Sequence, residues 1–597
     1  MHTKLEIASL VADFTSGARD PAVFLDGIYD RIASLGVHPV WIELLPRERA
    51  HSLLRSAQAR RTRGESLPLW GVPFAVKDNI DVAGVATTAA CPAYAYTPEH
   101  DAAVVARLLA AGAIPIGKTN MDQFATGLVG TRSPYGACSS VYDERYISGG
   151  SSSGSAVAVA LGLVAFSLGT DTAGSGRVPA AFNNLIGLKP TRGLLSTRGV
   201  VPACRSLDCV SVFANSLSDA AAVLDVCQGF DPADAYSRPV QAIDPRSTGC
   251  FGVPRAAQLE YFGNTEYARL YQAAVARYEA LGLKAREIDL APFLQAAQLL
   301  YGGPWVAERY AAVGSFIEQH EQDVAAVNPV VREIVLGGKS LSAADAFRGE
   351  YKLAALRQHA HGCLAEVDFL LLPTAPTHYT LAEVAAEPVL LNKRLGQYTN
   401  FVNLLDLAGL AVPAGFTAAG LPFGVTLLGA AFSDRALLGH AARLLGETAA
   451  AEELPVAQPT PPTVPQPSEI QLAVAGAHLS GQPLNFQLTQ RGARLLKTTR
   501  TGVEYKLYAL DGTVPPKPGV VLTPGFAGPG IEVEIWALDA AAFGSFVSEV
   551  PQPMTIGTAT LSDGSKVKSF LCEPFALGNA RDITHFGGWR AYLASQK

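Results

Sequence analysis

Two serines in glycine-rich turns are the residues of this sequence best suited to nucleophilic chemistry. Ser151 lies in the run S-G-G-S-S-S-G-S that begins at Ser148, and Ser175 lies in the run L-G-T-D-T-A-G-S-G-R. Glycines beside each serine allow backbone amides to approach a ligand closely. Successive amides beside a serine hydroxyl are the elements of an oxyanion-binding turn. The two turns therefore indicate acyl transfer on a serine.

A serine nucleophile needs a base, and Lys77 is the candidate. It ends the apolar segment L-W-G-V-P-F-A-V-K, which predicts a buried strand. Burial disfavours the ammonium form and can lower the pKa of a lysine toward neutrality, so that the amine can accept a proton. A helix over residues 156–162 and a strand over 163–168 are expected to bring the two serine turns together.

Other interpretations of the glycine-rich turns fit less well. A flexible linker would not be followed by an apolar helix and strand. The segment Gly150–Gly154 matches the G-x-S-x-G pattern of α/β-hydrolases, but the charged residues 142–146 stand where that pattern needs a buried strand. The phosphate-binding pattern G-x-x-x-x-G-K is absent, and no histidine is distinctively placed for a Ser-His-Asp triad.

Five motifs together resemble the amidase signature family. In chain order they are G-V-P-F-A-V-K-D-N, N-M-D-Q-F-A-T-G, G-G-S-S-S-G-S, G-T-D-T-A-G-S-G-R-V-P-A-A-F and G-L-K-P-T-R-G. Two positions depart from the usual family pattern, since Ser153 replaces a glycine and Gln123 replaces an acidic residue. Neither position belongs to the catalytic set that the resemblance implies.

That set is a Ser-cisSer-Lys triad. The resemblance makes Ser175 the nucleophile, Ser151 the bridging serine preceded by a cis peptide, and Lys77 the base. It places the oxyanion hole at the backbone amides of Thr172, Ala173, Gly174 and Ser175, and a substrate contact at Gly127. Asp171 and Arg177 flank the nucleophile and would either brace its turn or form an ordinary surface ion pair.

Three later segments resemble the allophanate hydrolases of that family. They are residues 196–211, residues 399–416 and the segment Y-G-G-P-W-V-A-E-R-Y-A-A that begins at Tyr301. Pro304 suits the first turn of a helix, and an arginine fork at Arg309 suits a carboxylate. From the residues alone, a surface arginine near a packed tyrosine is the simpler interpretation. The resemblance implies instead that Tyr301 and Arg309 bind the substrate carboxylate.

The composition describes a globular chain and argues against nucleic-acid binding. Of 597 residues, 49% are hydrophobic and 17% are charged, with a net charge of −6. Such a chain can fill a large core, but it offers no basic face for nucleic acid. We expect no membrane span, no signal peptide, and a soluble cytoplasmic protein. The eight scattered cysteines are expected to be free thiols, and no metal or organic cofactor is expected.

Alternating helices and strands predict an α/β fold, and the resemblance implies the amidase signature fold, a mixed β-sheet covered by helices on both faces. This domain is expected over residues 1–453. The proline-rich segment 454–467 is typical of an extended linker. Residues 468–597 predict a small β-rich α+β domain that resembles the C-terminal domain of allophanate hydrolase, with a γ-glutamylcyclotransferase-like fold.

The loop V-A-G-A-H-L-S-G of this smaller domain carries its one candidate site residue, His478. Ala475 stands where the cyclotransferases have the tyrosine of Y-G-x-L, so their activity is not expected here. A histidine beside a glycine turn can donate a proton near neutral pH, and a purely structural role is the alternative.

Together the resemblances imply hydrolysis of allophanate, urea-1-carboxylate, to ammonia and carbon dioxide, in the breakdown of urea or of s-triazines such as cyanurate. The alternatives are an amidase for another small carboxylated amide and an amidotransferase-like subunit of a larger assembly. A homodimer and a functional link to a urea carboxylase are expected. Whether the C-terminal domain catalyses the final decarboxylation or supports assembly is left open by the sequence.

Overall fold

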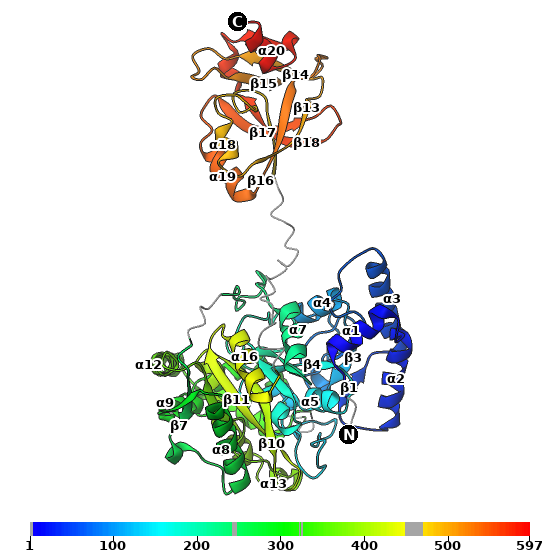
Figure 1. The fold of residues 1–597 in the computed structure, drawn as a ribbon, viewed down its shortest axis with the longest axis vertical. Coiled ribbons are helices and arrows are strands. Elements are labelled where there is room, and N and C mark those ends of the chain that lie inside the picture. Colours follow the sequence, from blue (N-terminus) through cyan, green and yellow to red (C-terminus); the bar gives the residue numbers. More distant parts are fainter. Residues whose placement is uncertain (1–3, 242–246, 321–322, 324–325, 448–469, 597) are drawn as a thin grey trace. The chain divides into compact units, whose positions relative to one another are not determined.

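The computed structural model divides the chain into two compact units, Met1–Gln458 and Pro459–Lys597. It describes residues 4–241, 247–320, 323, 326–447 and 470–596, and Figure 1 draws both units. The expected linker, residues 454–467, lies outside the described residues. None of the helices in the described ranges is long and apolar enough to cross a membrane.

An eleven-stranded mixed sheet organises the larger unit. The strand order is β1-β3-β2-β4-β6-β5-β10-β11-β9-β7-β8. Strand β2 runs parallel to both β3 and β4, whereas β10 is antiparallel to β5 and β11. The strands are β1 (Trp41–Leu44), β2 (Pro73–Lys77), β3 (Ile114–Thr119), β4 (Phe166–Asp171), β5 (Ile186–Lys189), β6 (Cys209–Ala214), β7 (Cys250–Pro254), β8 (Lys284–Ile288), β9 (Leu370–Pro373), β10 (Leu407–Phe416) and β11 (Pro422–Ala430).

Helices cover both faces of this sheet (Figure 1). Alternate residues of β9 show the two faces, because Leu371 enters one hydrophobic cluster and Leu370 and Leu372 enter another. The helices are α1 (Ile7–Ser16), α2 (Pro21–Ser34), α3 (Arg47–Thr62), α4 (Ala103–Ala110), α5 (Ser153–Ala160), α6 (Arg177–Phe182), α7 (Leu217–Cys227), α8 (Thr265–Ala280), α9 (Ala291–Gly302), α10 (Trp305–Gln319), α11 (Pro329–Gly337), α12 (Ala343–Leu364), α13 (Leu381–Ala386), α14 (Leu390–Leu395), α15 (Phe401–Leu404) and α16 (Asp434–Leu445).

The central strands β2, β3 and β4 are buried along their whole length. A strand covered on both faces carries a nearly continuous apolar run instead of an alternating pattern, which explains the sequence P-F-A-V that precedes Lys77. Helix α5 packs against these strands through small residues. A Cβ added to Gly154 would lie 2.3 Å from the carbonyl oxygen of Val40, so only glycine fits there.

The smaller unit is β-rich. It contains a five-stranded sheet with the order β13-β16-β12-β18-β17 and a three-stranded sheet with the order β15-β14-β19. Strands β17 and β18 form a hairpin at Gly564, where φ is 81°. The elements are β12 (Ile470–Val474), α18 (Phe486–Thr489), β13 (Arg494–Arg500), β14 (Tyr505–Ala509), β15 (Pro518–Leu522), β16 (Glu532–Leu538), α19 (Ala540–Ser548), β17 (Met554–Thr560), β18 (Lys566–Cys572), β19 (Arg581–Asp582) and α20 (Trp589–Ala594).

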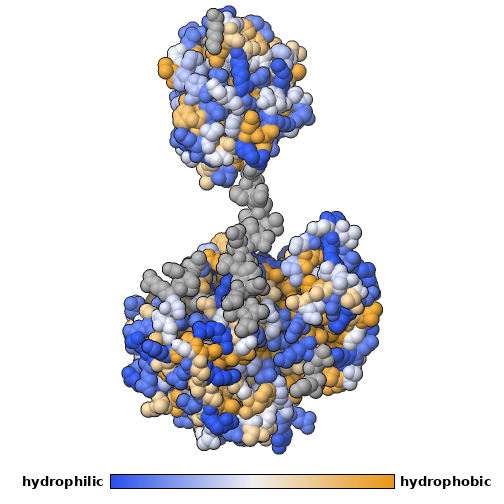
Figure 2. Space-filling view, viewed as in Figure 1, coloured by the Kyte–Doolittle hydropathy of each residue, from blue (hydrophilic) through white to orange (hydrophobic). Residues whose placement is uncertain are grey.

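The predicted fold class is therefore confirmed: a large mixed sheet covered by helices, followed by a small β-rich domain. On the face shown in Figure 2, hydrophilic and hydrophobic side chains are interspersed over each unit. Apolar side chains on a protein surface are normal when they are scattered in this way.

Candidate active site

Lys77 lies at the end of β2 with no exposed surface. Its amine donates hydrogen bonds of 2.7 Å to Ser151 Oγ and 2.7 Å to Thr170 Oγ1. Burial lowers the pKa of Lys77 from 10.5 to about 7, against the attraction of the carboxylates of Asp122, Asp171 and Asp208. A lysine in this environment can exchange a proton near neutral pH.

Ser151 is fully buried beside Lys77, and the peptide bond between Gly150 and Ser151 is cis. Its carbonyl oxygen accepts a 3.0 Å hydrogen bond from the backbone N–H of Asp122. The Asp122 carboxylate in turn accepts from the backbone N–H groups of Gly130 and Arg132. The turn that carries Ser151 is thereby fixed to the loop after β3.

Ser175 lies in the turn between β4 and α6 and is 2% exposed. Its hydroxyl donates to the carbonyl oxygen of Gly127 at 3.4 Å. The structure describes both Ser175 and Ser151, and no hydrogen bond joins them. Lys77 and Ser151 are thus in contact, whereas the Ser175 hydroxyl would have to turn away from Gly127 to join them.

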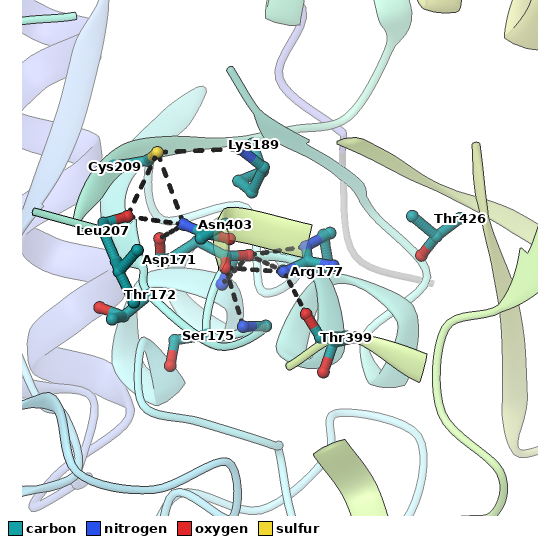
Figure 3. Close-up of polar contacts among 12 residues, drawn as sticks. Asp171, Thr172, Ser175, Arg177, Lys189, Leu207, Cys209, Thr399, Asn403 and Thr426 are labelled. Carbon is teal, nitrogen blue, oxygen red and sulfur yellow. Dashed lines mark hydrogen bonds and ion pairs between the residues drawn. The ribbon is translucent and has the colours of Figure 1, made fainter. Parts of the chain in front are cut away.

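A buried ion pair braces the turn that carries Ser175 (Figure 3). Arg177 binds the Asp171 carboxylate with two hydrogen bonds of 2.9 Å, and both side chains are fully buried. The same carboxylate accepts from the backbone N–H groups of Gly174 and Gly176. Burial raises the pKa of Asp171, but the ion pair and these hydrogen bonds outweigh it and hold the pKa below its usual value. The surface ion pair considered above is therefore not what forms.

The backbone N–H groups of the turn that carries Ser175 differ in whether they are free to donate to a ligand. The N–H of Gly174 donates to Asp171 at 2.8 Å. Those of Thr172, Ala173 and Ser175 have no acceptor among the described residues. These three amides are free to bind an oxyanion, and Gly174, which we also expected to donate, instead supports the turn at a φ of 129°.

Arg309 and Tyr301 come together at the junction of α9 and α10. Arg309 is 1% exposed and donates to Tyr301 Oη at 3.3 Å and to Thr126 Oγ1 at 3.0 Å. Thr126 precedes Gly127, which accepts the hydrogen bond of Ser175. Arg309 makes no ion pair among the described residues, and its Nε has no hydrogen-bond partner. A buried guanidinium without a carboxylate partner is suited to an anionic ligand.

Three supporting residues were missed by the sequence analysis. Thr170 binds Lys77, and Asp208 accepts a hydrogen bond from the hydroxyl of Thr172. Burial raises the pKa of Asp208 to about 6. Asn403 donates to the backbone carbonyls of Asp171 at 2.7 Å and Leu207 at 2.8 Å (Figure 3). None of the three carries a local sequence signal, because each meets its partner through the tertiary fold; Thr170, for example, reaches Lys77 through the pairing of β4 with β2.

His478 lies in the smaller unit, on the wall of a cavity of about 190 Å³. Its Nε2 lies 2.8 Å from Gln487 Oε1, and its ring stacks on Phe570 at a centroid distance of 5.1 Å. Burial lowers its pKa, and Lys517 also lines the cavity. A neutral histidine beside a lysine can bind an anion or transfer a proton.

Two family models match the chain. The Amidase model matches residues 35–438, and the model for the allophanate hydrolase C-terminal domain matches residues 470–594. No group of three or more histidine, cysteine, aspartate or glutamate side chains is arranged to hold a metal ion in the part of the chain that the structure describes.

Similar proteins share either the whole chain or its larger unit. Urea amidolyase of Saccharomyces cerevisiae is 46% identical over 96% of this chain, which spans 32% of that protein's length. The structure of Kluyveromyces lactis allophanate hydrolase covers 99% of each chain at 43% identity, with a TM-score of 0.72. A glutamyl-tRNA(Gln) amidotransferase subunit from Cupriavidus necator is 34% identical over 66% of this chain and 86% of its own length.

Proposed function

The chain belongs to the amidase family and shares both units with an allophanate hydrolase, and from this we propose that it hydrolyses allophanate to ammonia and carbon dioxide. Allophanate, H2N-CO-NH-COO⁻, has an amide at one end and a carboxylate at the other. The candidate site offers one group for each end. Ser175 faces the amide carbonyl, and Arg309 with Tyr301 binds the carboxylate.

The observation that carries the substrate assignment is Arg309. Its guanidinium is 1% exposed and contacts two hydroxyls, and it makes no ion pair with any described carboxylate. Leaving a charge buried and unpaired costs several kcal/mol, of the order of 3–5. An anionic substrate would supply the missing charge.

Acylation begins when the Ser175 hydroxyl leaves the Gly127 carbonyl and donates to Ser151. The Ser175 oxygen attacks the amide carbonyl while its proton passes to Ser151 and the proton of Ser151 passes to Lys77. The negative charge that develops on the carbonyl oxygen is bound by the amides of Thr172, Ala173 and Ser175. The carbon–nitrogen bond then breaks, and Lys77 returns its proton through Ser151 so that the nitrogen leaves as ammonia.

Deacylation repeats the sequence with water. Lys77, again neutral, takes a proton from water through Ser151, and the hydroxide attacks the acyl-enzyme carbonyl. Ser175 leaves with the proton, and N-carboxycarbamate is released. This product loses carbon dioxide to give carbamate and then ammonia and a second carbon dioxide, so that each allophanate yields two molecules of ammonia. The cavity at His478 is the place we propose for a catalysed decarboxylation in the smaller unit.

A functional link to a urea carboxylase, which would supply allophanate, belongs to the same proposal. It is supported by the match of this chain to part of a urea amidolyase. The homodimer and the cytoplasmic location remain predictions. The likeness to an amidotransferase component keeps a second possibility open, an amidase that feeds ammonia to partner chains. Allophanate turnover by the purified chain alone, run beside size-exclusion chromatography, separates the two.

The substrate assignment is tested by comparing allophanate with biuret, in which a neutral amide replaces the carboxylate. Arg309→Met should lower kcat/KM for allophanate by about 100-fold and leave that for biuret nearly unchanged. Arg309→Lys keeps the charge and should restore part of the activity. Equal losses on both substrates would show that Arg309 supports the fold instead of binding the carboxylate.

A further inference from the structure

A cavity of about 860 Å³ lies beside the candidate site in the larger unit. It adjoins the site through three separate segments. Tyr301 lines the cavity and also binds Arg309. Asn392 lines it and accepts from the backbone N–H of Leu128, the residue after Gly127, at 2.7 Å. Asn400 lines it next to Thr399, whose carbonyl accepts from Arg177. The cavity is therefore positioned as a vestibule to the site.

Arg132 is the buried charged group on the wall of this cavity. It is 3% exposed and donates to the backbone carbonyls of Thr126 at 2.9 Å and Pro388 at 2.7 Å. It makes no ion pair in the described ranges of the chain, and its buried Nε has no hydrogen-bond partner. Asp122 contributes an opposing charge, but its carboxylate accepts from backbone N–H groups instead of from the guanidinium.

Arg132 and Arg309 both donate hydrogen bonds to Thr126. Thr126 accepts from Arg132 through its carbonyl oxygen and from Arg309 through its hydroxyl. Burial lowers the pKa of Arg132, and the positive charge of Arg309 contributes to that shift. Two neighbouring guanidiniums repel each other, and neither has a carboxylate partner, so an anion between the cavity and the site would relieve both.

Other polar groups on the cavity wall suit the same ligand. The Oδ1 of Asn400 is buried without a hydrogen-bond partner, and an amide side chain can present its NH2 group instead by rotating. Lys393 is exposed, also lines the cavity, and has no ion-pair partner among the described residues. Glu333 is the one acidic side chain among the lining residues, and it is exposed on α11.

We propose that Arg132 is a second anion-binding residue of this enzyme, which takes up the carboxylate of a small amide in the vestibule and passes it to Arg309 and Tyr301. The identity of the substrate rests on the function proposed above. Arg132 would then set the preference for anionic over neutral amides and would act on capture of the substrate, and so on KM, more than on kcat.

The competing role is structural, because Arg132 also ties Thr126 to Pro388. Two ligands of nearly equal shape separate the roles. Malonamate is allophanate with a methylene in place of the central N–H, and malonamide is its neutral amide. A residue that only supports the loops affects both ligands alike, whereas an anion-binding residue affects malonamate selectively.

The experiment is calorimetric binding of both ligands to full-length Ser175→Ala protein, with and without Arg132→Met. Arg132→Met should weaken the binding of malonamate by about 10- to 100-fold and the binding of malonamide by less than about threefold. Arg132→Lys should recover part of the loss, since it keeps the charge without the fork. Arg269→Met, the same change at an exposed arginine on α8, is the control and should alter neither affinity.

If Arg132→Met weakens the binding of both ligands equally, or changes the binding of neither, the proposal for Arg132 is overturned. The proposed function still stands in that case if the Ser175→Ala protein with Arg132 intact binds malonamate more tightly than malonamide. A background protein that binds both ligands equally contradicts the vestibule and the carboxylate assignment together. If allophanate is not a substrate but malonamate binding depends on Arg132, the anion site stands and the proposed substrate falls.

Discussion

The amine of Lys77 lies 2.7 Å from the hydroxyl oxygen of Ser151, and neither side chain is exposed. This contact joins the end of a central strand to the turn before α5. The proton transfer proposed for the pair requires the amine to be neutral when it accepts a proton. Its protonation state is therefore the first property to test.

The pH dependence of the reaction should report Lys77. Burial lowers its pKa to about 7, so the ammonium form predominates below that pH and cannot act as a base. We expect kcat/KM for allophanate to rise about tenfold per pH unit below 7 and to level off above it. Steady-state rates between pH 5 and 9 check this, and an acid limb centred near the ordinary lysine pKa would contradict it.

Thr170→Val should remove the second hydroxyl that binds Lys77 while keeping the shape of the side chain. Loss of an acceptor that favours the ammonium lowers the pKa of Lys77 further, so the acid limb should move to lower pH. We expect kcat to fall by about tenfold because the amine is less well oriented. The pH profile separates this effect from general damage, since a misfolded site would lose activity without moving the limb.

Arg177→Met should destabilise the larger unit strongly. It leaves the Asp171 carboxylate buried and unpaired, which costs about 3–5 kcal/mol, and chemical unfolding measures the loss. Arg145→Met is the matched control, because Arg145 pairs with Asp143 at the surface with 76% of its side chain exposed, and a solvent-exposed pair contributes little to stability. Similar effects of the two substitutions would contradict the bracing role.

His478→Asn tests the smaller unit. The substitution keeps a polar side chain beside Gln487 but cannot transfer a proton, so release of carbon dioxide should slow while release of the first ammonia keeps its rate. Separate assays of the two products follow each step. Unchanged carbon dioxide release would assign His478 to packing against Phe570.

The sequence predicted the parts of the candidate site that lie in contiguous motifs. Lys77 ends an apolar strand, and Ser151 and Ser175 stand in glycine turns, so each carries a local signal. Thr170 does not, because it meets Lys77 through the pairing of β2 with β4, 93 residues away along the chain. The bond from Asn403 to Asp171 spans 232 residues and is equally invisible to local patterns.

Strand β10 could not be predicted from the sequence for a different reason. Its segment L-A-G-L-A-V-P-A-G-F was singled out as a motif but not predicted as a strand, and a proline inside a run argues against a central strand. The structure accommodates Pro413 at an irregularity, since the pairing with β11 shifts between Pro413 and Gly415. Such a shift depends on the partner strand and cannot be predicted from the segment alone.

The most direct test of the account is the ammonia released per allophanate consumed by wild type and by Ser175→Ala. Wild type should release two molecules of ammonia, and Ser175→Ala should lose activity by about three orders of magnitude or more while it still binds malonamate. Wild-type protein that leaves allophanate intact but cleaves simple amides would contradict the proposed substrate, and a Ser175→Ala protein with near wild-type turnover would contradict the proposed nucleophile.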